Sequence, residues 1–131
     1  MPCYQLLPQS PPPITPPISP TPIPSPIPTP ATNHPPVITT SSLPLARIFK
    51  PYLAFISGYD RDWKDYLTME VINLPPKIKV TSCYNLQFAK IKYITCRLEG
   101  TPTVKGNFNI LVILHDNRGL MDRKVLPLKI F

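Results

Sequence analysis

The sequence predicts an all-β domain folded as a sandwich of two sheets and preceded by an extended, proline-rich arm. Apolar and polar residues alternate with period two at short intervals after residue 45, whereas no long window keeps helical spacing. Residues 1–45 hold 16 of the 21 prolines and no charged side chain, while residues 46–131 hold all 14 basic and all 7 acidic residues. We therefore expect an arm over residues 1–45 and one domain over residues 46–131, a length that supports a single core.

The arm is expected to be extended. From Pro11 to Pro36 the prolines recur so often that both helix and sheet ladder are excluded, which leaves polyproline II. Isoleucines interrupt the prolines at spacings that do not match the three-residue turn of this helix, so they would contact surfaces on several sides. They are Ile14, Ile18, Ile23 and Ile27. A strap on neighbouring subunits, a ligand for polyproline-binding domains and a plain linker all remain open.

Six candidate strands follow the arm, each separated from the next by Gly, Pro, Asn or Asp residues that are typical of turns. They cover residues 47–57, 66–72, 77–83, 90–98, 108–114 and 124–131. This number and spacing of short strands indicate a sandwich.

The last two candidate strands have different expected places in their sheet. Residues 108–114 are apolar on both faces, which predicts a central strand whose second face, with Leu111 and Ile113, is also covered. In residues 124–131, Pro127 lacks the N–H group that a central strand would donate, which predicts an edge. A free edge is also where another chain can dock.

Several motifs recur in a fixed order in the second half of the domain. Gly100-Thr101-Pro102 is followed by an alternating strand from Gly106, by Asp116-Asn117-Arg118-Gly119 and by a terminal apolar strand. This order resembles the cadherin-like, immunoglobulin-like repeat family of microbial surface proteins and dystroglycan-type proteins. Upstream, Leu74-Pro75-Pro76-Lys77-Ile78 is similar to the family's L-P-x-G-L turn, with Lys77 in the place of the glycine.

The resemblance covers about Leu43 to Phe131. It implies an Ig-like (cadherin-like) β-sandwich that serves adhesion, spacing or assembly rather than catalysis. It also implies a candidate calcium site, because cadherin-like domains gather loop carboxylates around this ion. The candidate ligands are Asp60, Asp62 and Asp116, with Asp65 beside them. The alternative is a solvated turn with local ion pairs, which the interposed Arg61 and Lys64 favour, and on that interpretation no cofactor is expected.

Catalytic constellations are missing from the sequence. Its only histidines are His34 and His115, which do not form a nucleophile–base set or a multi-histidine metal site. The four glycines are scattered, so no phosphate-binding loop is present. We expect the protein not to be an enzyme.

Two cysteines of the domain lie on strands that we expect to be neighbours. Cys83 and Cys96 are 13 residues apart, a spacing that brings their Cα atoms within bridging distance if the strands pair. A disulfide would imply an oxidising compartment. Two buried free thiols are the alternative.

The basic residues of the domain include two lysine pairs on candidate strands: Lys77, Lys79, Lys90 and Lys92. If the two strands are neighbours, the four ammonium groups share one face that suits an anionic surface. The alternative is a solvated sheet face. No basic and aromatic motif of a nucleic-acid platform accompanies them, so nucleic acid is not the expected partner.

Together these features predict a non-enzymatic structural or adhesion module, a subunit of a fibre, surface layer or shell whose arm straps onto neighbouring subunits. The expected partners are other protein subunits, in a homo- or hetero-oligomeric assembly at a cell or particle surface. No apolar run is long enough to span a membrane, and no secretory signal is legible. An adaptor whose arm binds polyproline-reading domains, or a basic nucleic-acid-associated protein, are the alternative functions.

Overall fold

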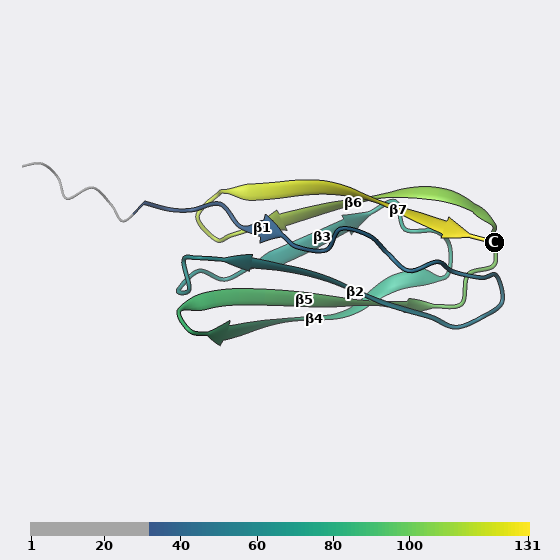
Figure 1. The fold of residues 1–131 in the computed structure, drawn as a ribbon, viewed down its shortest axis with the longest axis horizontal. Helices are drawn as coiled ribbons and strands as arrows, with labels where there is room; N and C mark the ends of the chain where they lie inside the picture. Colours follow the sequence, from purple (N-terminus) through teal and green to yellow (C-terminus); the bar gives the residue numbers. More distant parts are fainter. Residues whose placement is uncertain (1–31) are drawn as a thin grey trace, which may run out of the picture. The chain divides into compact units, whose positions relative to one another are not determined.

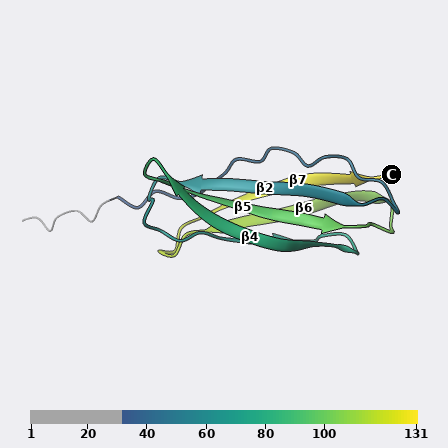
Figure 2. The same ribbon diagram turned by 90° about the horizontal axis from the view of Figure 1, so that it is seen from below.

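Seven strands form two antiparallel sheets in the computed structural model, which describes residues 32–131 (Figure 1). The first sheet has the order β1-β2-β5-β4, and the second has the order β3-β6-β7. The strands are β1 (Val37–Ile38), β2 (Tyr52–Asp60), β3 (Thr68–Ile72), β4 (Ile78–Phe88), β5 (Ile91–Gly100), β6 (Gly106–His115) and β7 (Met121–Ile130). Figure 2 shows β2, β5 and β4 in front of β6 and β7, so the sheets are stacked layers. The prediction of an all-β sandwich is confirmed.

The core lies between the sheets and is built by alternation of buried and exposed residues along β2 and over much of β5, β6 and β7. Inward-facing residues of β2 and β5 meet those of β6 and β7, and nearly all of them are aliphatic. The most deeply buried include Ile56, Ile94, Leu98, Ile110, Val112, Leu114, Leu126 and Leu128. Because burial of one such side chain contributes roughly 1.5–3 kcal/mol, this layer supplies most of the stability of the domain.

Strands β6 and β7 occupy the places that the sequence predicts, since β6 lies between β3 and β7 and β7 is at an edge. One detail differs. Leu111 and Ile113 on the outer face of β6 are half-buried, Leu111 lying between Ile72 and Val125 of the neighbouring strands. Within residues 32–131, neighbours in the same sheet and not a third layer shield this outer face.

The chain before β2 also belongs to the sandwich. The compact unit starts at Asn33, so the boundary expected between residues 45 and 46 lies too late in the chain. Ile38 pairs with Gly58 and is 4% exposed, and Leu43 is buried in the same core. The N–H groups of Ala46 and Ile48 donate to carbonyls of residues 129 and 131, so this segment covers part of the β7 edge. Residues 33–45 contain prolines and no charged side chain, so by composition they resemble the arm.

The isoleucines expected to contact partners, Ile14 to Ile27, lie outside the described residues. The expected arm over residues 1–31 therefore stays a prediction from the sequence. In the part of the chain that is described, no helix is long and apolar enough to cross a membrane.

A disulfide joins Cys83 of β4 to Cys96 of β5, with the two Cα atoms 4.0 Å apart. The two residues are directly opposite in the antiparallel register. Cys96 is fully buried, whereas Cys83 lies on the edge strand of the first sheet. The bridge therefore fastens the outermost strand of this sheet to its core.

In the turn before β4, Lys77 stands where the L-P-x-G-L element has glycine, and its backbone has the conformation that glycine favours. Lys77 has a φ of 73°, in the left-handed region where glycine is favoured. Its carbonyl faces Gly100, where an added Cβ would lie 1.7 Å from the Lys77 oxygen. The close approach of these two backbones accounts for the glycine of the Gly-Thr-Pro element.

Replacing Ile38 with alanine tests whether the segment before β2 is part of the core. We expect Ile38→Ala to lower the free energy of unfolding by about 2–5 kcal/mol, the usual cost of truncating a buried aliphatic side chain. Val37→Ala is the matched control, because Val37 is 38% exposed, and should cost about 0.5 kcal/mol or less. Urea denaturation measures both. Equal, small effects would place residues 37 and 38 outside the fold.

Replacing both cysteines with serine tests the disulfide. A bridge across a 13-residue separation stabilises by about 3 kcal/mol, chiefly by restricting the unfolded chain. We expect Cys83→Ser/Cys96→Ser to lose this amount in urea denaturation, and reductant to shift the wild type similarly while leaving the variant unchanged. A wild type that does not respond to reductant would contradict the bridge.

Candidate functional site

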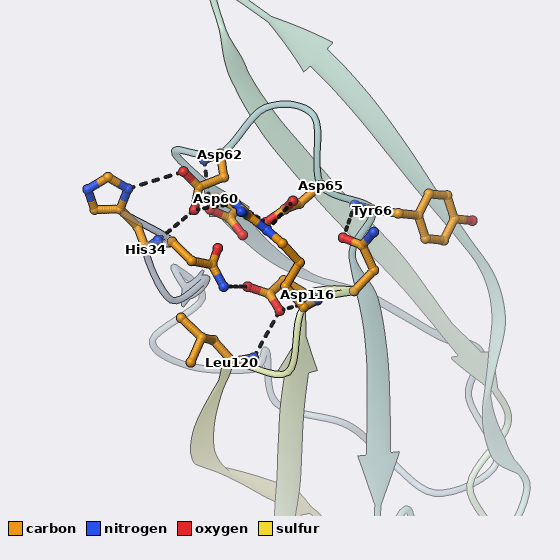
Figure 3. A network of polar contacts seen from close by, with 10 residues as sticks. His34, Asp60, Asp62, Asp65, Tyr66, Asp116 and Leu120 are labelled. Carbon is orange, nitrogen blue, oxygen red and sulfur yellow. Dashed lines mark hydrogen bonds and ion pairs between the residues drawn. The ribbon is translucent and has the colours of Figure 1, made fainter. Parts of the chain in front are cut away.

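Polar side chains gather at one end of the sandwich, where the chain enters β1 and where β2 and β6 end (Figure 3). We call this set the acidic network. It consists of Asn33, His34, Asp60, Asp62, Asp65, Asp116 and Arg118. Asp60, Asp65 and Asp116 are all buried, which is rare for carboxylates and shows that the network is part of the folded interior.

Asp116 organises the turn between β6 and β7. Its Oδ1 accepts hydrogen bonds from the N–H groups of Arg118, at 2.8 Å, and of Leu120, at 2.9 Å. Its Oδ2 accepts a hydrogen bond from Nδ2 of Asn33 at 3.2 Å. An aspartate that bonds backbone two residues ahead is a common way to fix a tight turn. Asp116 therefore both shapes its own turn and holds the incoming chain.

Asp62 and Asp65 are paired with cations of other segments. Arg118 Nε lies 3.0 Å from Asp65 Oδ1, and its Nη2 lies 3.5 Å from Asp62 Oδ2. The hydrogen bond to Asp65 raises the pKa of Arg118. Asp62 also accepts the backbone N–H of His34, and its Oδ1 lies 3.2 Å from His34 Nδ1. Burial works to raise the pKa of Asp62, but the hydrogen bonds and charge of His34 hold it below its usual value.

Asp60 is the buried centre of the network and has no exposed surface. Its Oδ1 accepts the N–H of Asp62 at 2.8 Å, whereas its buried Oδ2 has no hydrogen-bond partner. Burial, followed by the charges of the neighbouring aspartates, raises the pKa of Asp60. Asp60 and Asp62 thus have pKa values shifted in opposite directions.

The structure brings three of the candidate carboxylates together and pairs two of them with Arg118. One oxygen each of Asp60, Asp62 and Asp65 lies within 4.8 Å of the others. Calcium requires six to eight oxygens, and the Arg118 guanidinium already occupies Asp62 and Asp65. Asp116, in the expected set, is engaged by two N–H groups and by Asn33.

The ion pairs differ from those the sequence suggested. Arg61 is exposed, and Lys64 Nζ lies 5.2 Å from the ring centre of Trp63. Arg118, which is 53 residues from Asp65, supplies the compensating charge instead. Three of its carboxylates, those of Asp60, Asp65 and Asp116, are buried, whereas the side chains of His34 and Arg118 are partly exposed.

A second feature lies on the outer side of the first sheet, towards the viewer in Figure 2. Residues directly opposite in antiparallel strands project to the same side, so Tyr59, Tyr93 and Leu86 share this side across β2, β5 and β4. We call the whole set the apolar face. It consists of Leu53, Phe55, Tyr59, Tyr84, Leu86, Phe88 and Tyr93.

The apolar face is open to solvent in the described structure. Leu86 is 58% exposed and Phe88 is 70% exposed. Beside them lies a depression of about 370 Å³, lined also by Thr39, Tyr93 and Thr95. Exposed apolar side chains gathered on one side of a sheet, such as Tyr84, Leu86 and Phe88, are typical of interaction sites in soluble proteins.

Sequence reasoning missed this face because the expected strand ended at residue 83. The structure continues β4 to Phe88, and the alternation of Tyr84, Leu86 and Phe88 on one side was the signal that could have found it. Apolar residues on both sides of β2, such as Leu53 and Phe55 beside Ala54, were a second signal.

The four lysines expected to share a face do not do so. Strands β4 and β5 are neighbours, but they are antiparallel, so Lys79 lies opposite Glu99 and Lys92 lies opposite Gln87 at the other end of the pair. Lys77 and Lys90 belong to the turns before and after β4. The basic residues are therefore divided between the two ends of the sheet.

The opposite pKa shifts of Asp60 and Asp62 give a pH prediction. Ionisation of Asp60 is disfavoured in the folded state, so its contribution to stability falls as pH rises through its raised pKa. Asp62 contributes stability above its unfolded pKa and loses it as pH falls. Urea denaturation between pH 3 and 7 should therefore show Asp60→Asn gaining stability relative to wild type as pH rises, and Asp62→Asn losing it. The same slope for both variants would contradict the assigned roles.

The same variants distinguish a network compensated in part by Arg118 from a calcium site. For the wild type, we expect the midpoint of urea denaturation to be the same in chelator and in millimolar calcium. A midpoint that rises with calcium, and no longer rises in Asp60→Asn, would show that a cation and not Arg118 alone compensates the carboxylates.

Comparison with known proteins finds the fold but no family. No family profile matches the chain, and no curated protein matches it. Among solved structures, the SrpA adhesin from Streptococcus sanguinis matches with a TM-score of 0.60 at 13% identity, over 76% of this chain and 58% of that chain. The sialic acid binding region of a Streptococcus sanguinis SK1 adhesin, bound to 3'sLn, matches with a TM-score of 0.55 at 19% identity, over 75% of this chain and 30% of that chain.

A third match is a Bacteroides fragilis protein described as a candidate alpha-galactosidase/melibiase. Its TM-score is 0.52 at 18% identity, over 73% of this chain and 17% of that chain. The chain spans less than two thirds of each of these structures, and at these identities the likeness shows a shared fold. The solved structures that share this β-sandwich thus include bacterial adhesin domains.

Proposed function

We propose that this protein is a non-enzymatic structural or adhesion module, a subunit of an assembly at a cell or particle surface. In this proposal the sandwich is a rigid block and the uncharged arm straps it to neighbouring subunits. The observation that carries the proposal is the way in which the chain is fastened where it enters the sandwich, at residues 33–38.

Carboxylates from both sheets hold the entering chain. Asp116, which follows β6, accepts Asn33 Nδ2, and Asp62, which follows β2, accepts the backbone N–H of His34. Asp122 of β7 accepts the N–H of Ile38 at 2.8 Å. Ile38 then enters the core. Such an anchor would let the sandwich resist a pull on the arm from a neighbouring subunit, as a strap requires.

Both histidines of the described domain have carboxylate partners within the fold, which supports a role other than catalysis. His34 is paired with Asp62, and His115 Nε2 lies 2.8 Å from Glu70 Oε1 on the neighbouring strand of the second sheet. In the acidic network, Asp62 and Asp65 are paired with Arg118, and Asp116 and Asp62 hold the chain entry. The adhesins among the structures that share the fold are consistent with this role.

Deleting residues 1–31 tests the proposal, because this cut leaves the whole compact unit. We expect the shortened chain to keep the melting temperature of the full chain but to be lost from the surface or particle fraction of its native cells. Arm variants that keep every proline and replace the four isoleucines with serine should show an intermediate loss. Undiminished incorporation of the shortened chain, at equal expression, would refute the strap.

A further inference from the structure

The apolar face carries aromatic rings where a polyproline ligand needs them. Tyr59 of β2, Tyr93 of β5 and Leu86 of β4 form one row across the sheet, and Phe88 extends it at the end of β4. Polyproline segments dock in grooves lined by aromatic side chains, because their preformed helix loses little entropy on binding. The depression of about 370 Å³ lies along this row.

The charge of the face matches the charge of the arm. The charged residues on this side lie away from the row: Arg97, opposite Phe55, is paired with Glu99 at 3.0 Å, and Lys79 lies opposite Glu99. The row itself consists of uncharged side chains. Residues 11–30 also contain no charged residue, and they combine prolines with Ile14, Ile18, Ile23 and Ile27. An uncharged ligand loses no ionic hydration when it binds an uncharged surface.

We propose that the apolar face is the docking site for residues 11–30 of a second copy of this chain, with some of the isoleucines against the sheet and the others free to contact further surfaces. This inference rests on the proposed function and names the surface that receives the strap. The two partners are both supplied by the chain, so assembly requires only copies of itself.

A second copy, and not the same molecule, is the occupant because of the arm's sequence and its point of entry. The chain enters at Asn33, where its side chain is held at Asp116, beyond the end of the sheet. Residues 11–30 are rich in proline and contain no glycine, the residue that most readily allows a chain to fold back on itself. We therefore assign the strap to a neighbouring copy, as the proposed function requires.

Sedimentation of the full chain over a range of concentrations tests the proposal. We expect the wild type to self-associate, and Phe88→Ser and Leu86→Ser each to weaken association about tenfold or more, as loss of an anchoring contact does. Both side chains are more than half exposed, so the variants should fold. Val125→Ser, at an exposed apolar position of β7 on the other sheet, is the matched control and should associate as the wild type does.

A synthetic peptide of residues 11–30 provides the second measurement. Added to the full chain, it should compete with assembly and shift the amide resonances of Leu86, Phe88 and Tyr93. A peptide with the same prolines and serine in place of the isoleucines should do neither. A chain that stays monomeric at every concentration, or assembly that both face variants leave intact, would overturn the proposal.

The two proposals fail differently. If the peptide does not bind and the face variants still assemble, but deletion of residues 1–31 abolishes incorporation in cells, the arm straps onto a different protein. In that case the proposed function stands and this inference is refuted. If deletion has no effect in cells, the strap itself is refuted.

Discussion

The anchoring of residues 33–38 across the end of the sandwich is the constraint on which the rest of the account depends. The groups that hold this segment come from both sheets: Asp62 follows β2, Asp116 follows β6, and Asp122 lies on β7. Burying carboxylates is costly, and Arg118 offsets part of that cost by pairing with Asp62 and Asp65. The result is a fixed path for residues 33–38 across the end of the sandwich.

Charge is distributed unevenly along the chain, and the anchored segment lies on the uncharged side of the boundary. Every charged residue lies after residue 45, whereas the arm is uncharged and contains four isoleucines. The sandwich in turn leaves one apolar face open, with Phe88 and Leu86 more than half exposed. Docking of this uncharged, isoleucine-containing segment on the apolar face would remove apolar groups of both from water at no cost in ionic desolvation.

The fold was largely predictable from the sequence, because short apolar strands are separated by turn residues and Pro127 marks the edge. The start of the domain was not, since Ile38 and Leu43 stand among prolines and their burial depends on strands more distant in the sequence. The carboxylate cluster was recognised, but its partner Arg118 was not, because only the packing of the two sheets brings it to Asp65. The positions of the lysines were not predictable either, because they depend on the antiparallel direction of β4 and β5.

Intermolecular paramagnetic relaxation enhancement tests directly whether the arm of one copy lies on the sandwich of another. A spin label is attached at Ser25→Cys in a chain carrying Cys3→Ser, and this chain is mixed with isotope-labelled, spin-free wild type. The account predicts broadening of the amide signals of Leu86, Phe88 and Tyr93 in the labelled partner. Undisturbed signals in the mixture, or broadening only when label and isotope share one molecule, would contradict it.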